Sequence, residues 1–177
     1  MKGKKIFLIG FMGCGKSTIA NLLASEMKLP LKDIDLIIEK RAELTISEIF
    51  NEHGENFFRY LEGVVLNEIL LDAGEMIVST GGGLPCFDHR MEWMNRNDIT
   101  IYLKCSVETL FNRIQKDSGK RPLVVNRTES ELKEFVQNKL GERKSIYESA
   151  SIIVDGNLSS NEVVQEILKQ IKLQAEE

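Results

Sequence analysis

The sequence predicts an α/β fold in which a parallel β-sheet is covered by helices on both faces. Two observations lead to this prediction. Short apolar segments alternate with longer amphipathic segments along almost the whole chain, and the first apolar segment runs directly into a glycine-rich loop. Strands that alternate with helices build a parallel sheet, and such sheets bind ligands beyond the carboxyl ends of their strands. We therefore expect a ligand site at that edge of the sheet.

Length and composition restrict the class of protein. The 177 residues suit one domain spanning 1–177, and the 42% hydrophobic and 28% charged residues are typical of a soluble globular protein. A formal net charge of -4 argues against a nonspecific nucleic-acid surface, which needs clustered cations. No apolar run approaches the roughly 20 residues that span a bilayer, and the first apolar stretch is too short for a signal peptide. We expect a cytoplasmic protein that binds neither membranes nor nucleic acid.

The first half of the chain begins with a strand at Lys5–Ile9, a glycine loop and a helix. That helix is marked by apolar residues at helical spacing, namely Ile19, Leu22, Leu23 and Met27. A short strand at Leu31–Asp33 follows, and Thr45 with Glu48 forms a capping box that starts a long helical region. Gly54 is expected to break that region. The helix beyond it is marked by Phe58, Leu61, Val65, Ile69 and Leu70.

The second half continues the alternation. A strand at residues 76–78 runs into Gly81, Gly82 and Gly83, which neither a strand nor a helix would continue, so a loop opens at its carboxyl end. The next elements are expected to be a helix near 88–95, a strand at 99–103, a helix at Val107–Lys116, a helix capped by Thr128 and Glu131, a strand at 152–154 and a last helix capped by Ser159 and Glu162. Residues 117–127 have no periodicity, and we interpret them as a mobile surface loop such as a lid.

Residues 10–17 read Gly-Phe-Met-Gly-Cys-Gly-Lys-Ser and match the phosphate-binding pattern G-x-x-x-x-G-K-[S/T]. The glycines of this pattern let backbone N–H groups close around phosphate oxygens at the start of a helix. A predicted strand before the loop and a predicted helix after it supply the context that the motif requires. We therefore predict that the chain binds a nucleoside triphosphate, with Lys16 at the β- and γ-phosphates and the Ser17 hydroxyl on Mg²⁺.

A phosphate-binding loop normally has a second metal ligand, a carboxylate at the end of a neighbouring strand. No carboxylate follows the strand at 76–78, whereas Asp33 and Asp35 stand at the end of the strand at Leu31–Asp33. One aspartate could serve the metal while the other orients an attacking hydroxyl and accepts its proton. The alternative is a helix N-cap with a spare surface acid.

Several cations and one thiol are ambiguous when each is taken alone. Arg59 and Arg143 lie in predicted helices, where an arginine is more often a solvated cation than a ligand clamp. Arg121 lies in the lid-like loop and could swing onto a transferring phosphate, although a merely charged surface loop would look the same. Cys14, beside Lys16 at a helix N-terminus, could be acidic and reactive or simply a small side chain.

Taken together, six segments resemble the shikimate kinase family: GFMGCGKST, DID followed by Ile38 and Glu39, SEIF with HGENFFRYLE, TGGG, KRPL and ERKSIYESA. They cover nearly the whole chain, and their order and spacing agree as well as their identities. The resemblance implies a three-layer αβα P-loop kinase fold, like that of nucleoside monophosphate kinases, with a five-stranded parallel sheet ordered 2-3-1-4-5. It also implies a helical substrate-binding insert at about 33–62, a lid at about 113–127 and a monomer.

The resemblance also implies roles for single residues. Asp35 would hold the hydroxyl groups of shikimate and act as the base, while Arg59 and Arg143 would clamp the shikimate carboxylate through bidentate contacts. Backbone N–H groups of the glycines would lie close to shikimate, namely those of Gly81, Gly82 and Gly83. The other ligands would be bound as follows: ATP by Gly13, Cys14, Gly15, Lys16, Ser17, Thr18, Arg113 and Arg121, and Mg²⁺ by Ser17 and Asp33. Lys16 and Arg121 would share the catalysis with Asp35, and Arg113 would stack on the adenine.

Three positions depart from the family pattern. Cys14 stands where Ser, Ala or Thr is more usual, Leu44 and Thr45 stand where a glycine is usual, and the segment 84–87 is idiosyncratic. The first change should preserve the phosphate cradle, and neither of the others removes a catalytic group.

The reaction that this resemblance implies is transfer of the γ-phosphoryl group of ATP to the 3-hydroxyl of shikimate. The products are ADP and shikimate 3-phosphate, on the pathway to chorismate and the aromatic amino acids. Two alternatives stay open. A kinase for another polyol acid, such as gluconate, would also use two arginines, although the order of TGGG, RPL and ERKxxY favours shikimate. A nucleotide-binding regulatory module without transfer activity would have no chemical need for Lys16, Asp33, Asp35 and both arginines.

Overall fold

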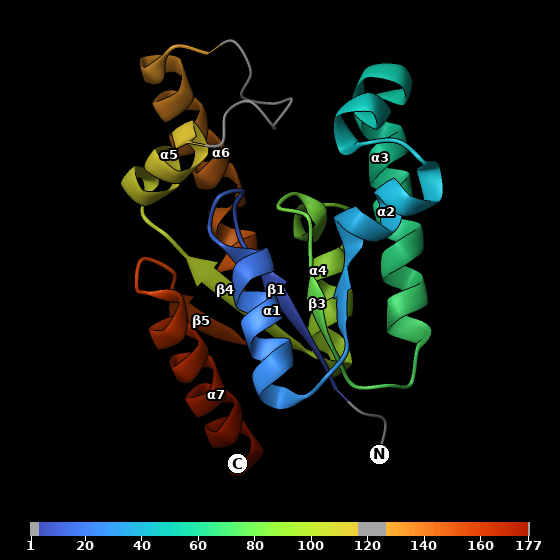
Figure 1. The fold of residues 1–177 in the computed structure, drawn as a ribbon, viewed down its shortest axis with the longest axis vertical. Coiled ribbons are helices and arrows are strands. Elements are labelled where there is room, and N and C mark those ends of the chain that lie inside the picture. Colours follow the sequence, from blue (N-terminus) through green and yellow to red (C-terminus); the bar gives the residue numbers. More distant parts are fainter. Residues whose placement is uncertain (1–3, 117–126, 177) are drawn as a thin grey trace.

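The computed structural model describes residues 4–116 and 127–176, which form one parallel sheet covered by helices (Figure 1). The five strands are β1 at Lys5–Ile9, β2 at Leu31–Asp33, β3 at Met76–Ser79, β4 at Ile99–Lys104 and β5 at Ile152–Asp155. Their order across the sheet is β2-β3-β1-β4-β5, and every neighbouring pair is parallel. The predicted α/β class and the predicted strand order are both confirmed.

The helices form an outer layer on each face of this sheet. They are α1 at Lys16–Met27, α2 at Ile34–Ala42, α3 at Ile46–Leu71, α4 at Arg90–Asn97, α5 at Val107–Lys116, α6 at Glu129–Tyr147 and α7 at Ser160–Glu176, with a 3₁₀ turn η1 at Leu84–Cys86. Helices α1 and α7 pack side by side in front of the sheet, and α4 packs behind it (Figure 1). At the carboxyl ends of the strands, the pair α2–α3 stands on one side and the pair α5–α6 on the other (Figure 1). Within the described ranges, none of the helices combines the length and apolar composition that a membrane crossing needs.

Burial explains which strands are central. All five residues of β1 and all four of β3 are buried, as expected for strands covered by helices on both faces. The edge strand β5 instead alternates between buried and exposed residues. Lys5 is the polar exception in β1, and its ammonium is satisfied because Nζ donates to the carbonyl oxygen of Asp72 at 2.8 Å. The central strand is thereby anchored where it enters the core.

The turn between α2 and α3 shows how the chain replaces the glycine that the family pattern has there. Glu43 ends α2 in the left-handed region, with φ of 54°. The predicted capping box then starts α3. Thr45 Oγ1 accepts from the backbone N–H of Glu48 at 3.2 Å, and the Glu48 carboxylate accepts from the backbone N–H of Thr45 at 2.7 Å. The predicted break at Gly54 is confirmed: with φ of 80° and ψ of 172° this residue is not helical, and α3 consists of two helical segments that meet there in a kink.

Gly54 and Gly141 give a matched test of this kink, because a Cβ built on either glycine meets nothing within 4 Å. The backbone of Gly54 lies in a region used almost only by glycine, so we expect Gly54→Ala to destabilise the fold by about 1–3 kcal/mol. Gly141 lies inside α6, and Gly141→Ala should stabilise the fold by about 0.5–1 kcal/mol. Urea denaturation measures both. A Gly54→Ala variant as stable as the native protein would contradict the strained kink.

Candidate active site

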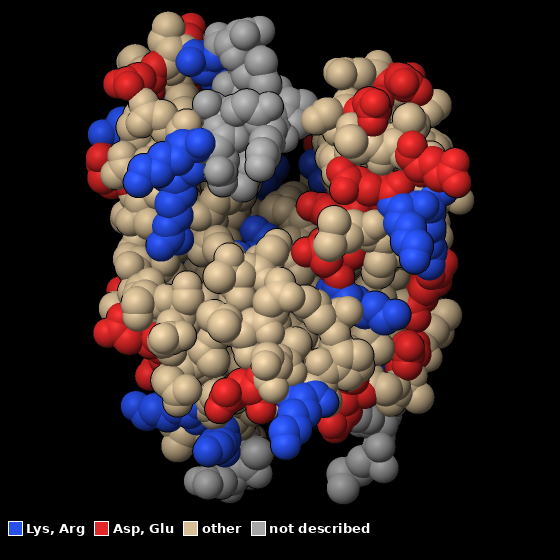
Figure 2. All heavy atoms as spheres, in the orientation of Figure 1, with Lys and Arg blue, Asp and Glu red and all other residues tan. Residues whose placement is uncertain are grey.

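One pocket of about 1270 Å³ opens at the carboxyl ends of the strands, between the α2–α3 and α5–α6 pairs. Figure 2 shows the hollow, with basic side chains inside it and acidic side chains along the wall formed by α2 and α3. Every predicted site residue that the structure describes lines this pocket: Gly13, Cys14, Gly15, Lys16, Ser17, Thr18, Asp33, Asp35, Arg59, Gly81, Gly82, Gly83, Arg113 and Arg143. Arg121, together with most of the predicted lid, lies outside the described residues.

The glycine loop curls between β1 and α1. Gly13 and Gly15 have φ of 80° and 97°, which side chains rarely adopt, so these positions need glycine. Gly15 has no side chain that could cap α1, and the N–H groups of the first helical turn are left for a ligand. The Lys16 ammonium lies against the loop and donates to the carbonyl oxygens of Gly10 at 2.8 Å and Phe11 at 3.0 Å. The loop therefore presents amides and a cation at one place, which suits a polyphosphate.

Cys14 is only 3% exposed, and its sulfur packs against Gly10, where a Cβ would come within 2.9 Å of it. Reactive thiols are usually accessible. The burial therefore favours the interpretation of Cys14 as a small side chain that fits the loop. Cys105, which donates to the Cys14 carbonyl at 3.8 Å, is also buried, and burial raises its pKa to about 12.

Asp33 has two different oxygen contacts. Its Oδ1 caps α2 by accepting from the backbone N–H groups of Asp35 at 3.1 Å and Leu36 at 3.3 Å. Its Oδ2 accepts from the Ser17 hydroxyl at 3.4 Å. The N-cap interpretation of Asp33 is therefore correct, but the same carboxylate also faces Ser17. A hydroxyl and a carboxylate oxygen side by side are ligands that Mg²⁺ prefers, with phosphate oxygens and water completing its shell.

Asp35 sits in the first turn of α2 and is not a spare surface acid. Its Oδ1 is buried and has no hydrogen-bond partner among the described residues. Burial, together with the nearby carboxylates of Glu62 and Asp33, raises the pKa of Asp35 to about 7, against the opposing effect of Lys16. A carboxylate with such a pKa can accept a proton near neutral pH.

None of the three glycines after β3 has a positive φ, so their backbone conformation does not call for glycine. The reason for glycine there is the close approach of neighbouring atoms. A Cβ at Gly82 would lie 3.2 Å from the backbone nitrogen of Met12 in the glycine loop. A Cβ at Gly81 would lie 2.5 Å from Glu62 Oε1, and one at Gly83 would lie 2.8 Å from the Arg59 guanidinium. The segment therefore packs its backbone against the phosphate loop and against α3 at the same time.

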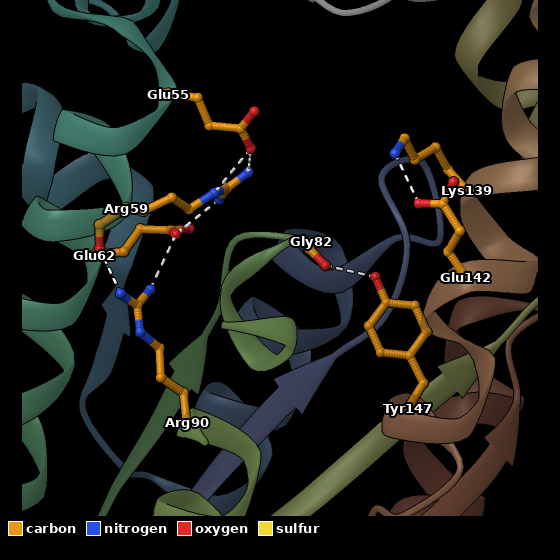
Figure 3. Close-up of polar contacts among 8 residues, drawn as sticks. All are labelled: Glu55, Arg59, Glu62, Gly82, Arg90, Lys139, Glu142 and Tyr147. Carbon is orange, nitrogen blue, oxygen red and sulfur yellow. Dashed lines mark hydrogen bonds and ion pairs between the residues drawn. The ribbon is translucent and has the colours of Figure 1, made fainter. Parts of the chain in front are cut away.

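Arg59 is a buried arginine, 8% exposed, and is held on several sides rather than solvated. Nη1 donates to Glu62 Oε2 at 2.8 Å, and Nη2 donates to Glu55 Oε1 at 2.8 Å (Figure 3). The guanidinium also lies over the ring of Phe87, 4.5 Å from its centroid. The segment 84–87 thus supports Arg59 through Phe87. Sequence reasoning missed this supporting contact. The spacing of Arg59 and Glu62 on one helical face is the signal that would have suggested their pairing.

Helix α6 brings Arg143 to the opposite wall of the pocket, with its guanidinium 5.7 Å from the centroid of the Phe11 ring. One turn further on, the hydroxyl of the buried Tyr147 donates to the carbonyl oxygen of Gly82 (Figure 3). The Tyr147 ring also packs on that of Tyr102, with centroids 5.1 Å apart. Tyr147 was not predicted as a site residue, yet it docks the helix that carries Arg143 onto the glycine segment.

Arg113 reaches from α5 to two other parts of the site. Its Nη1 donates to the carbonyl oxygen of Cys14 at 3.2 Å, and its Nη2 donates to that of Gly156 at 3.2 Å. The guanidinium thus bridges the phosphate loop and the loop that follows β5. It lies on the phosphate-loop side of the pocket.

Comparison with known proteins agrees with this arrangement. The family model described as "Shikimate kinase" matches residues 12–172. A shikimate kinase from Flavobacterium johnsoniae is 45% identical over 168 residues, covering 93% of this chain and 97% of that protein. One from Parabacteroides distasonis is 41% identical, covering 86% of this chain and 87% of that protein.

Solved structures give the same result. The shikimate kinase from Bacteroides thetaiotaomicron superposes with a TM-score of 0.90 at 33% identity, covering 96% of this chain and 98% of that chain. The shikimate kinase from Acinetobacter baumannii in complex with shikimate has a TM-score of 0.88 at 30% identity, covering 97% and 94%. A gluconokinase from Sinorhizobium meliloti, with a TM-score of 0.64 at 18% identity, shares the fold alone. The chain therefore belongs to the shikimate kinase family.

Proposed function

We propose that this protein transfers the γ-phosphoryl group of ATP to the 3-hydroxyl of shikimate, giving ADP and shikimate 3-phosphate. The observation that carries the proposal is the meeting of two half-sites in one pocket of a shikimate kinase family member: a phosphate loop, and a set of acceptor residues made of the Asp35 carboxylate and two arginines. The reaction belongs to the pathway that leads to chorismate and the aromatic amino acids. ATP is the co-substrate.

In the nucleotide half, we assign the phosphates to the amides of residues 13–18 and to Lys16, which lies within reach of the loop. Ser17 and Asp33 would hold Mg²⁺, whose charge, when bound, neutralises phosphate oxygens and so aids transfer. Arg113, at the junction of the phosphate loop and the loop after β5, is assigned to the adenine. Arg121, outside the described residues, is proposed to close over the phosphates as part of a lid at about 113–127.

The acceptor half is formed mainly by residues 33–62. We assign the shikimate carboxylate to Arg59 of α3 and Arg143 of α6, which both line the pocket. Two guanidinium groups pair well with a planar carboxylate. Asp35 would hold the hydroxyl groups and take the proton of the attacking one, and the amides of Gly81, Gly82 and Gly83 would face the ligand. The proposal includes a monomer that acts in the cytoplasm, where ATP is available.

The first prediction concerns the substrate. Purified protein with ATP and Mg²⁺ should release ADP when shikimate is added, and 3-phosphorylated shikimate should appear in equal amount. Gluconate is the control, because a gluconokinase shares the fold, and it should give no ADP above background. Removal of Mg²⁺ with a chelator should stop the reaction. An absence of shikimate-dependent ADP would refute the proposed function.

A second prediction separates the two half-sites. Asp35→Asn keeps the size of the side chain but cannot accept the proton, so turnover should fall by a factor of about 10²–10⁴. Binding of ATP, measured by calorimetry, should stay within about twofold of the native value, because Asp35 is assigned to the acceptor. A large loss of ATP affinity would show that this division of the pocket is wrong.

The raised pKa of Asp35 gives a third prediction, for the dependence on pH. Because the free enzyme must carry Asp35 ionised, kcat/KM for shikimate should rise about tenfold per pH unit below pH 7 and level off above it. Folding also disfavours the ionised form of Asp35, because the pKa rises from its ordinary value near 3.8 to about 7. The free energy of unfolding should therefore fall as the pH rises from about 4 to 7 and stay constant above pH 7. The melting temperature of Asp35→Asn should therefore exceed that of the native protein by a margin that grows over this range. A constant margin would contradict the shift.

A further inference from the structure

Arg90 is a buried arginine for which the predicted site has no role. It is the first residue of α4 and is 2% exposed. Unlike Arg59 and Arg143, it is not among the residues that line the pocket. A buried guanidinium is unfavourable unless acceptors satisfy its donors, so the acceptors of Arg90 show which part of the structure it holds.

The donors of Arg90 converge on the two residues that form the acceptor wall (Figure 3). Nη2 donates to the backbone carbonyl oxygen of Arg59 at 2.6 Å, and Nη1 donates to Glu62 Oε2 at 3.4 Å. A further contact, from Nη2, goes to Asp88 Oδ2 at 3.2 Å. Helix α3 leaves room for the guanidinium because residue 63 is glycine, where a Cβ would lie 3.1 Å from Nη2.

Glu62 links Arg90 to the Arg59 side chain. Glu62 is 0% exposed, and its Oε2 accepts from Arg59 Nη1 at 2.8 Å as well as from Arg90. Its Oε1 has no partner among the described residues and lies against Gly81. Burial raises the pKa of Glu62, while the guanidinium groups of Arg59, Arg90 and Arg143 act in the opposite direction. Arg90 is thus one of the cations that favour the ionised form of Glu62, which holds Arg59.

We propose that Arg90 is a positioning residue for the acceptor half of the site: it fixes Glu62 and the backbone of Arg59, and so aims the Arg59 guanidinium at the substrate carboxylate without touching the substrate. This inference rests on the proposed function. The competing explanation is that Arg90 only ties α4 to α3. A mere tie would affect stability, and any effect on catalysis would fall on both substrates alike.

The test is steady-state kinetics of Arg90→Met with ATP and shikimate varied in turn. Methionine keeps the aliphatic stem but has neither the charge nor the donors. We expect KM for shikimate to rise about tenfold, a size typical of coupling between contacting residues, while kcat and KM for ATP stay within about twofold. An unchanged KM for shikimate, or an equal rise in both KM values, would overturn the proposal.

Two further variants separate positioning from packing. Arg90→Lys keeps the charge but cannot reach all three acceptors, so its KM for shikimate should lie between those of the native protein and Arg90→Met. Should Arg90→Met fail to fold, Arg90→Lys carries the test, and a native KM for shikimate in it overturns the proposal. In a Glu62→Gln background, Arg90→Met should add less than about twofold, because both changes break the same link. Effects that multiply would count against the proposal.

Arg41→Met is the matched control. Arg41 donates to both carboxylate oxygens of Glu68, at 2.9 Å and 2.6 Å, and so ties α2 to α3 outside the pocket. Its loss should leave both KM values unchanged. The native protein in the same assay keeps the two proposals apart: no turnover of shikimate by it refutes the function itself, whereas native turnover with an unaffected Arg90→Met refutes only the role of Arg90.

Discussion

The close contact between the glycine loop and the segment after β3 is the constraint on which the rest of the site depends. Strands β1 and β3 pair in parallel with Leu8 opposite Ser79, so both chains leave the sheet at the same level. Thr80 then donates to the Leu8 carbonyl oxygen from its backbone N–H at 3.3 Å and from its hydroxyl at 3.0 Å. The next residues follow the glycine loop so closely that a Cβ at Gly82 would lie 3.2 Å from the backbone nitrogen of Met12. The glycine loop and the segment after β3 therefore form one continuous floor of the pocket.

The acceptor half combines several buried charges, which is an unfavourable arrangement in the absence of pairing. The structure pairs Arg59 and Arg90 through Glu62, but it leaves Asp35 Oδ1, Glu62 Oε1 and Arg90 Nε without partners among the described residues. Two partnerless carboxylate oxygens beside Gly81 are a local cost that packing elsewhere must offset. Sites that bind polar ligands commonly carry such costs, since the ligand supplies the missing donors. The hydroxyl groups of a polyol acid are donors of the required kind.

Sequence patterns predicted the parts of this molecule whose causes are local. The phosphate loop and the helix caps at Thr45 and Thr128 depend on residues within a few positions of each other, and the structure contains both caps. The strand order came from the family resemblance, because no local pattern determines which strands are neighbours. Sequence reasoning missed Glu62, Arg90 and Tyr147, whose roles depend on approaches between segments far apart in the chain. Arg90, for example, is 28 positions from the glutamate that it contacts.

The same distinction applies to the arginines, which were ambiguous in the sequence and which the structure brings to one pocket. Two helical pairs flank the phosphate loop, and each carries residues for the pocket. The α2–α3 pair holds Asp35 and Arg59 and is tied by the Arg41–Glu68 ion pair. The α5–α6 pair holds Arg113, which contacts the phosphate loop, and Arg143, and Tyr147 docks it on Gly82. Since the α5–α6 pair carries both arginines, a shift of this pair against α2–α3 would move Arg113 and Arg143 together. The hydrogen bond from the Tyr147 hydroxyl to the Gly82 carbonyl oxygen opposes such a shift.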